Sequence, residues 1–280
     1  MKIYEEMLRL KEEGRSSAVA TIVQCIGSSP QKEGAKMLIR DDGSIMGTLG
    51  GGCLEAEVIQ ASLMVLVDGS PRAIPFELTE LHGGLVCGGK VLVYIEPVLP
   101  EPVIVILGAG HVGRALSKAA TFSGFKVTLI DDRYEYASRE HFPDAYEIIV
   151  TDFENPFLSV SVDKKTFVVI ATRGHNHDLD ALRAALKTDA KYIGILGSRR
   201  KKALLFKTLR DEGFAEESIA RVRIPVGLTI GSVTPEEIAI SIMAQIVQQR
   251  RGHAATGLGH SSCSRLGKED GPVKAAPCPG

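Results

Sequence analysis

The chain has 280 residues, of which 44% are hydrophobic and 24% charged, and its formal net charge is −1. This composition is typical of a folded globular protein and excludes a largely disordered or collagen-like chain. With about 150 residues per domain, the length predicts two domains. The near-neutral charge lacks the broad basic field that non-specific nucleic-acid binding uses, so we expect no nucleic-acid partner.

The sequence predicts a cytoplasmic protein without a membrane partner. The first 14 residues, MKIYEEMLRLKEEG, contain no apolar core of a secretory signal. The most apolar stretch is interrupted by three prolines and two glutamates between Glu96 and Pro102, which excludes a membrane span there. The five cysteines are odd in number and form no CxxC pair, a pattern typical of reduced thiols rather than of a disulfide framework or zinc ribbon.

The part before Glu96 is predicted to be a small α+β unit. Ile3, Met7 and Leu10 recur at helical spacing before Gly14, which predicts a helix over 2–13. A second helix is expected over 54–67, and strands are expected at 17–26, 35–40, 44–47, 73–78 and 90–95. The proline-rich segment 96–102 is predicted to be a linker, which divides the chain into domains at 1–97 and 102–252.

After the linker, β-branched runs alternate with helical segments. Strands are predicted at 103–107, 127–130, 147–150, 167–171 and 192–196. This alternation predicts an α/β domain with a Rossmann-like, doubly wound parallel sheet. Thr234-Pro235-Glu236-Glu237 is a capping box that begins a last helix, which ends near Arg251. Residues 253–280 are rich in Gly, Ser, Pro and Ala, so we expect a disordered tail in which Cys263 and Cys278 have no role.

A glycine fingerprint follows the first strand of the predicted parallel sheet. Gly108, Gly110 and Gly113 have the GxGxxG spacing, His111 lies among them, and Asp131 ends the next strand. Such glycines allow a tight turn, close approach of a pyrophosphate and helix packing, while the acidic residue accepts a hydrogen bond from a ribose hydroxyl. The pattern predicts a Rossmann fold but leaves dinucleotide binding open, and Arg133 leaves the choice of NAD or NADP open.

Two polar segments follow later strands, at the carboxyl edge of the predicted sheet. His175, His177 and Asp178 could ligate a metal, or the histidines could act in acid–base catalysis. Alternatively, Asp178 caps the next helix and the histidines are exposed loop residues. Ser198 is a predicted N-cap, and the cations at 199–202 either attract a phosphate or an acidic partner surface or form a solvated basic face.

The first domain contains two Gly/Cys loops. Gly50, Gly51, Gly52 and Cys53 stand at the start of a predicted helix, and Cys87-Gly88 precedes a predicted strand. A helix N-terminus favours an anion and lowers the pKa of a cysteine, so the loops predict an anion site with a thiolate. Alternatively, Cys53 is a small core residue and the glycines only form turns.

At these motifs the chain resembles the XdhC/CoxI family, the accessory factors that mature xanthine dehydrogenase and related molybdenum hydroxylases. The resemblance covers nearly all of residues 1–252. In the first domain it rests on residues 27–30, 34–37, 50–55 and 87–89, and in the second on residues 108–113, 131–133, 172–175, 197–201 and 234–239.

The resemblance implies a chaperone that binds the molybdenum cofactor (molybdopterin) as cargo. It implies that the chain protects this cargo while a cysteine desulfurase replaces an oxo ligand with sulfur, and helps to deliver it to the hydroxylase apo-enzyme, in purine catabolism if that enzyme is xanthine dehydrogenase. A homodimer is the base-rate expectation. The candidate cofactor-binding residues are Gly50, Gly51, Gly52, Cys53, Cys87, Gly88, Gly108, Gly110, His111, Gly113 and Asp131.

In this hypothesis the two Gly/Cys loops form one side of the site, and the 108–113 crevice and the 172–178 loop form the other. One alternative is an NAD(P)-dependent oxidoreductase that uses His175 or His177 as its acid–base group. A second alternative is a docking platform whose basic segment 198–202 binds an acidic surface of the hydroxylase or the desulfurase.

Overall fold

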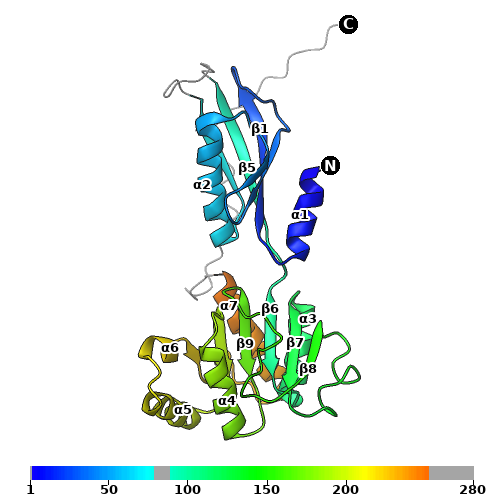
Figure 1. Cartoon of the computed structure of the whole chain (residues 1–280), viewed down its shortest axis with the longest axis vertical. Helices are drawn as coiled ribbons and strands as arrows, with labels where there is room; N and C mark the ends of the chain where they lie inside the picture. The colour runs from blue at the N-terminus through cyan, green and yellow to red at the C-terminus, as the bar shows by residue number, and fades with distance from the viewer. Residues whose placement is uncertain (1, 79–88, 252–280) are drawn as a thin grey trace.

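The structure is a computed structural model that describes residues 2–78 and 89–251, arranged as two α/β units stacked end to end (Figure 1). The chain passes from one unit to the other between β5 (Lys90–Val98) and β6 (Val103–Leu107). Cys87, Gly88, Cys263, Cys278 and the predicted tail lie outside the described residues. None of the helices in the described ranges combines the length and the apolar character that crossing a membrane requires.

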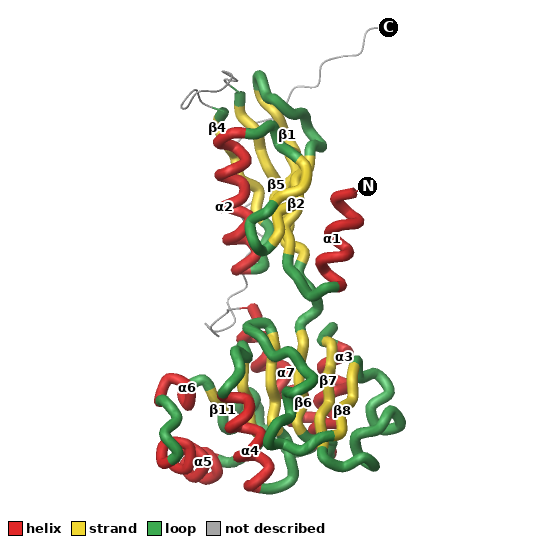
Figure 2. Tube along the Cα trace, in the orientation of Figure 1, coloured by secondary structure: helices red, strands yellow, loops and turns green. Residues whose placement is uncertain are grey.

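The N-terminal unit is a five-stranded antiparallel sheet with one helix on each face (Figure 2). Besides β5, its elements are α1 (Lys2–Glu12), β1 (Ser17–Ile26), β2 (Lys36–Arg40), β3 (Ile45–Gly47), α2 (Gly52–Asp68) and β4 (Arg72–Glu77). The strand order is β3-β2-β1-β5-β4. The predicted helices and strands are therefore present, and α2 begins two residues before the predicted start at Leu54.

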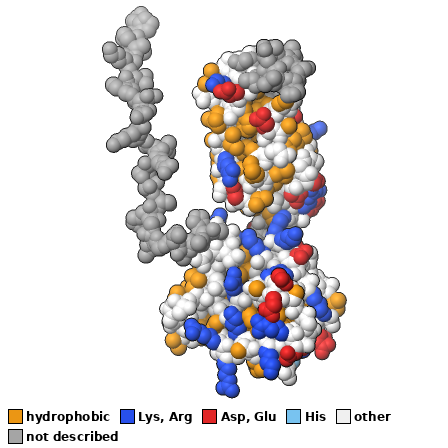
Figure 3. All heavy atoms as spheres, turned by 90° about the vertical axis from the view of Figure 1, so that its left-hand side faces the viewer, with side chains coloured by type: hydrophobic (Ala, Val, Ile, Leu, Met, Phe, Trp, Pro, Cys, Tyr) orange, Lys and Arg blue, Asp and Glu red, His pale blue; other side chains and the backbone are white. Residues whose placement is uncertain are grey.

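Alternate residues of β1 pack on the two helices. Ala18 and Ile22 belong to the core beneath α2, and Val19 belongs to the smaller cluster that Leu10 of α1 completes. This period of two is the property of a strand buried on both faces. Figure 3 looks onto the side of the molecule where α2 lies, and hydrophobic side chains cover much of the N-terminal unit on this side. Among them, Met64 and Val67 of α2 are exposed.

The predicted linker begins too early, because β5 continues through Glu96 and Pro97 to Val98. Ala18 of β1 pairs with Pro97, whereas β4 pairs with β5 only as far as Ile95. Beyond Ile95 one side of β5 is therefore an edge, and an edge tolerates a residue without an N–H group. The proline-rich segment leaves the sheet only after Val98.

The C-terminal unit is a six-stranded sheet with the order β11-β10-β9-β6-β7-β8, in which all pairs are parallel. Its other strands are β7 (Lys126–Asp131), β8 (Glu147–Val150), β9 (Thr166–Ile170), β10 (Tyr192–Ile195) and β11 (Val222–Arg223), of which β11 was not predicted. Its helices are α3 (His111–Phe122), α4 (His175–Leu186), α5 (Arg199–Asp211), α6 (Glu216–Ala220) and α7 (Pro235–Arg251). The predicted doubly wound sheet is confirmed.

The two faces of this sheet have separate cores. Ile104 and Ile106 of β6 pack with Leu116 of α3 and Ile242 of α7, whereas Val105 and Leu107 pack on the side of α4 and α5. The chain runs from β6 through β7 to β8 on one side and then crosses to β9 on the other side of β6, so the strand order reverses beside β6. Ligands of doubly wound sheets bind at the carboxyl ends of the strands at such a reversal.

The two units direct their loops toward opposite ends of the molecule. Ile26 of β1 and Lys90 of β5 pair at the end of the first sheet that is remote from the second unit. The carboxyl ends of β6, β7 and β9 lie at the far end of the second sheet (Figure 1). Between these two ends the chain passes through β5, with 9 residues, and β6, with 5. At the rise per residue of a strand, Lys90 and Leu107 are therefore on the order of 40 Å apart.

Candidate functional site

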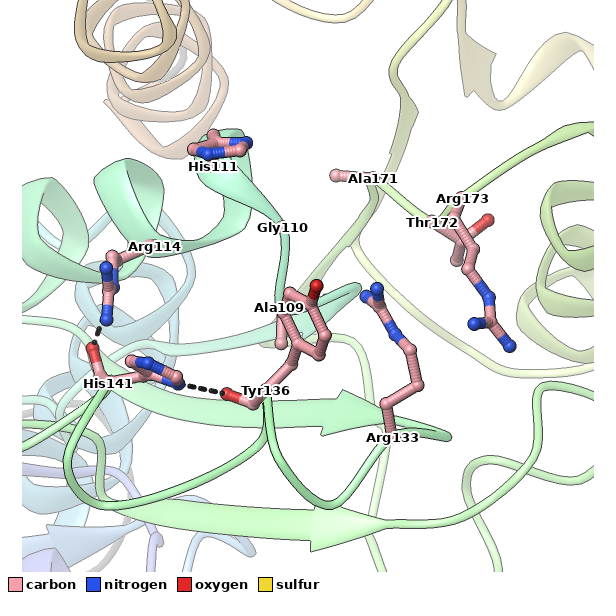
Figure 4. Close-up of a pocket in the computed structure, with 10 residues that line it drawn as sticks. All are labelled: Ala109, Gly110, His111, Arg114, Arg133, Tyr136, His141, Ala171, Thr172 and Arg173. Atoms are coloured by element: carbon pink, nitrogen blue, oxygen red, sulfur yellow. Dashed lines mark hydrogen bonds between the residues drawn. The ribbon is translucent and has the colours of Figure 1, made fainter.

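A cavity of about 300 Å³ lies at the carboxyl edge of the parallel sheet, where the strand order reverses (Figure 4). The loop after β6, the start of α3, the loop after β7 and the loop after β9 surround it. Its lining residues are Ala109, Gly110, His111, Arg114, Arg133, Tyr136, His141, Ala171, Thr172 and Arg173. Of the fingerprint residues, Gly110 and His111 line the cavity.

The three glycines of the fingerprint have different roles. A Cβ on Gly108, whose φ is +121°, would overlap the carbonyl oxygen of Ala171, and one on Gly113 would overlap the carbonyl oxygen of Gly108. These two glycines let β6, β9 and α3 approach each other closely. A Cβ on Gly110 would meet no atom within 4 Å, so Gly110 instead leaves space at the open side of the loop.

Asp131 lies beneath the glycine loop and is 1% exposed. Its Oδ2 accepts hydrogen bonds from Ala109 N at 2.7 Å and Arg133 Nη2 at 2.9 Å, and its Oδ1 accepts from Arg133 N at 3.0 Å and Nε at 2.8 Å. Burial raises the pKa of Asp131, but the hydrogen bonds and the charge of Arg133 outweigh burial and hold the pKa below its ordinary value. Asp131 is therefore a carboxylate that already has a cationic partner.

Arginines give the cavity its charge. The Arg133 guanidinium stacks on the Tyr136 ring at 3.9 Å, and Arg173 Nη2 donates to Asp132 Oδ2 at 2.5 Å. Arg114 Nε donates to the carbonyl oxygen of His141 at 3.4 Å (Figure 4). Asp131 and Asp132 thus balance two arginines, and Arg114 adds positive charge at the start of α3, where anions are favoured.

The structure gives the residues of the predicted catalytic or metal-binding group at 175–178 different surroundings. His175 is the first residue of α4, Gly174 is its N-cap, and the His177 ring packs edge-on against Phe153 at 5.5 Å. Asp178 is fully buried; it accepts a hydrogen bond from Thr172 Oγ1 at 2.7 Å and pairs with Lys201. Across residues 2–78 and 89–251, no three His, Cys, Asp or Glu side chains could together hold a metal ion.

The alternative prediction that Asp178 caps α4 is wrong, because Gly174 is the N-cap of this helix. Asp178 lies in the first turn, and its side chain points into the protein. Its partner Lys201 comes from the basic segment after β10 and also donates to the carbonyl oxygen of Leu196 at 2.9 Å. Ser198 is the predicted N-cap, and its Oγ accepts from Lys201 N at 3.3 Å. Of the four cations, Lys201 is thus directed inward, while Arg199 and Arg200 are exposed.

Two loops of the N-terminal unit and Gly89, the residue before β5, meet at the far end of this unit. A Cβ on Gly50 would lie 2.8 Å from the Cβ of Pro30, and one on Gly89 would overlap the carbonyl oxygen of Ser28. Residues 27–30, 50–53 and 89 are therefore in contact, and Cys53 is exposed in the first turn of α2. Beside them Ser29 is 9% exposed, and its Oγ has no hydrogen-bond partner within the described ranges.

The protein's own carboxylate occupies the N–H groups of the glycine loop. Glu55 Oε1 accepts hydrogen bonds from Thr48 Oγ1 at 2.6 Å, Leu49 N at 2.9 Å and Gly51 N at 3.0 Å. Burial raises the pKa of Glu55, but these bonds outweigh burial and lower the pKa below its ordinary value. The sequence predicted an anion site with a thiolate at this loop. The structure shows an exposed Cys53 there, and the anion bound to the loop is the Glu55 carboxylate of the same helix.

The two groups of predicted cofactor-binding residues do not form one site within a chain. Gly50 to Cys53 lie at the far end of the first unit, and the 108–113 crevice lies at the opposite end of the second (Figure 1). The hypothesis of one site with two sides is therefore wrong for a single chain. The sequence gives no sign of this separation, because it depends on the direction in which each strand runs.

Sequence reasoning missed several residues of the cavity. Tyr136 and His141 lie in the long connection between β7 and β8, and Arg114 lies one turn into α3. No periodic pattern marks the first two. Arg173 could have been found, because it follows β9 directly, at the edge where doubly wound sheets bind ligands.

Comparison with known proteins agrees with this architecture. Residues 104–246 match the XdhC Rossmann domain, and residues 10–77 match the XdhC and CoxI family. The chain is 38% identical over 252 residues to the uncharacterised protein YqeB of Escherichia coli K12, and this match spans 89% of the chain but only 46% of YqeB.

Two further similarities cover most of both partners. The chain is 24% identical to the molybdenum cofactor insertion chaperone PaoD of E. coli K12, over 85% of this chain and 84% of PaoD. A crystal structure described as a xanthine dehydrogenase from Bacillus halodurans has 26% identity and a TM-score of 0.50, over 92% of this chain and 98% of that one. The Rossmann match covers more than half of the sequence, and with the match in the first unit it shows that the chain belongs to the XdhC and CoxI family.

Proposed function

We propose that the chain is an accessory protein that binds the molybdenum cofactor and assists the maturation of a xanthine dehydrogenase or a related molybdenum hydroxylase. The family membership and the similarity to a molybdenum cofactor insertion chaperone support this role. The apo-hydroxylase is then the partner that receives the cofactor. A cysteine desulfurase, a second copy of the chain and a cytoplasmic location stay predictions of the same hypothesis.

The observation that carries the proposal is the contact of the 27–30 loop with the 50–53 loop and with Gly89 at the far end of the first unit, where Cys53 is exposed. Thiolate is a ligand that suits soft metal centres, and loops rich in glycine allow a ligand to approach the backbone. We infer that Cys53 contacts the cofactor there. Glu55 would hold the glycine loop in shape rather than bind the cofactor, because its carboxylate is already bonded to that loop.

The alternative of an NAD(P)-dependent oxidoreductase is not proposed here. His175 and His177, the histidines predicted to transfer a proton, do not line the cavity beside the glycine fingerprint. The acidic residue of the fingerprint, Asp131, is bonded to Arg133.

The test is an anaerobic titration of the full chain with isolated molybdenum cofactor, followed by absorbance and by co-elution in gel filtration. We expect the wild-type chain to retain the cofactor and Cys53→Ala to bind it at least tenfold more weakly. Cys25→Ala is the matched control, because Cys25 is half-buried in the same unit and its thiol contacts the carbonyl oxygen of Gln31. A folded wild-type chain that binds no cofactor would disprove the proposal, and equal binding by Cys53→Ala would remove Cys53 from the site.

A further inference from the structure

We propose that the cavity beside Gly110 binds a phosphate group of an anionic ligand and that Arg133 makes this cavity reject adenine dinucleotides. The inference goes beyond the proposed function, because it concerns the opposite end of the molecule from Cys53 and assigns a selectivity to one residue. It rests on the contacts of Asp131, the fixed position of Arg133 and the charge of the remaining cavity.

Asp131 has no acceptor capacity left for a ribose. An ionised carboxylate offers about four lone-pair sites on its two oxygens. Ala109 N and three donors of Arg133 occupy these sites, at 2.7 to 3.0 Å. In a dinucleotide-binding Rossmann fold, the residue at this position accepts hydrogen bonds from ribose hydroxyls. A dinucleotide would therefore have to displace Arg133 from a carboxylate that is almost completely buried.

Contacts with three residues hold Arg133 in this place. Its backbone N–H and its guanidinium both bond to Asp131, its guanidinium stacks on Tyr136 at 3.9 Å, and its Nε lies 3.8 Å from Asp132 Oδ1. Figure 4 shows Arg133 and Tyr136 standing beside the glycine loop, on the side of the cavity where the loop after β7 enters. Moving the guanidinium away would leave a buried charge without its partner, which is costly. The arginine thus blocks the ribose position.

The rest of the cavity suits a phosphate. No side chain caps the N-terminus of α3 and no acidic residue lies in its first turn, and this helix end lines the cavity through Gly110 and His111. A Cβ on Gly110 would meet no atom within 4 Å, which leaves space for a ligand atom. Arg114 and Arg173 lie on two sides of this space, and none of the lining residues is acidic.

The experiment measures binding of three probes to the full chain by isothermal titration calorimetry: inorganic pyrophosphate, NADH and NADPH. We expect the wild-type chain to bind pyrophosphate when each probe is present at about 1 mM. It should bind neither dinucleotide at that concentration. Gly110→Ala should fold and bind pyrophosphate at least tenfold more weakly, because its added methyl group enters the cavity. Arg200→Ala, which removes an exposed arginine outside the cavity, is the control and should bind like the wild type.

Arg133→Ala tests the selectivity. Removing the guanidinium frees acceptor sites on Asp131, so we expect NADH affinity to rise at least tenfold. Arg133→Lys, which keeps a charge without the fork of donors, should give a smaller rise. If Arg133→Ala does not fold, the NADH affinity of Arg133→Lys compared with that of the wild-type chain still tests whether Arg133 excludes dinucleotides.

Binding of NADH or NADPH to the wild-type chain as tightly as pyrophosphate would overturn the proposal, as would folded Arg133 variants without any gain in NADH affinity. A wild-type chain that binds no pyrophosphate would also overturn it. These outcomes differ from failure of the proposed function, which appears in the titration with molybdenum cofactor and in the Cys53 variant.

Discussion

Each carboxylate oxygen of Asp131 accepts two hydrogen bonds, and this arrangement contributes to the acid sensitivity of the C-terminal unit. The folded state holds the pKa of Asp131 below its ordinary value of 3.8. A group whose pKa is lower when folded than when unfolded stabilises the protein above the unfolded value, and this stabilisation is lost as the pH falls through the folded value. Asp131 therefore contributes fully at neutral pH and loses its contribution below about pH 4.

We predict that Asp131→Asn lowers the free energy of unfolding at pH 7 by about 1.5–3 kcal/mol, the range for hydrogen bonds to charged groups. The variant should also lose less stability than the wild type between about pH 4 and pH 2, since it has one carboxylate fewer to protonate. Urea unfolding at a series of pH values measures both effects. Asp144→Asn, at an exposed position, is the control; equal pH dependence of Asp131→Asn and wild type would contradict the prediction.

Gly108 and Gly110 give a paired prediction within the same loop. Gly108→Ala places a methyl group against the carbonyl oxygen of Ala171 at a φ of +121°, so we expect a loss of at least about 2 kcal/mol or failure to fold. Gly110→Ala should change stability by less than about 1 kcal/mol, because its Cβ meets no atom within 4 Å and its φ is −72°. Thermal unfolding followed by circular dichroism compares them, and equal melting temperatures would contradict this assignment.

At the scale of elements, the helices α7 and α2 begin in different ways. At the start of α7, Thr234 Oγ1 accepts from Glu237 N at 3.2 Å, while Glu237 Oε2 accepts from Val233 N at 2.7 Å and Thr234 N at 3.0 Å. This is the predicted capping box. The N-cap of α2 is Gly51, which has no side chain, and Glu55 in the first turn bonds back to the loop instead. Both glutamates have a lowered pKa, Glu237 through its backbone hydrogen bonds and Glu55 because hydrogen bonds outweigh burial.

We predict that Thr234→Ala destabilises the chain by about 1 kcal/mol, the usual cost of losing an N-cap hydroxyl. Thr234→Ser retains the oxygen and should restore most of the stability. Chemical denaturation of the two variants checks this expectation. If Thr234→Ser were as unstable as Thr234→Ala, the hydroxyl would not be the stabilising group.

At the scale of the whole molecule, the two units have separate cores. Each described hydrophobic cluster lies within one unit: Ile22 and Val58 belong to the first, and Ile104 and Val105 to the second. Besides the chain itself, Lys165 connects them by donating to the carbonyl oxygen of Gly14 at 3.3 Å and to Ser16 Oγ at 3.2 Å. Such a polar contact couples two units weakly, because exposed lysine contacts contribute little to stability.

We predict two unfolding transitions in scanning calorimetry of the full chain. A fragment of residues 102–252, cut at the predicted domain boundary, should fold and unfold near one of the two transition temperatures. Lys165→Ala should leave both temperatures within a few degrees of the wild type. A single transition, together with an unfolded fragment, would show that the units fold as one cooperative body.

The sequence by itself determined most of the elements, the type of the second sheet and the family. Strands such as Val103–Leu107 were predicted to the residue, because a run of β-branched residues between turn signals depends only on local sequence. The glycine spacing predicted the turn after β6 for the same reason, because the close approach that Gly113 allows is to the carbonyl oxygen of Gly108, five residues earlier.

The tertiary structure decided which groups reach each other. Ala109 N donates to Asp131, Arg173 pairs with Asp132, and Lys201 turns inward to Asp178. It also decided that the start of α2, with Cys53, and the start of α3, beside Gly110, lie at opposite ends of the molecule (Figure 1). Side-chain partners depend on the directions in which packed elements run and on loops that return to them, and no local period in the sequence records either.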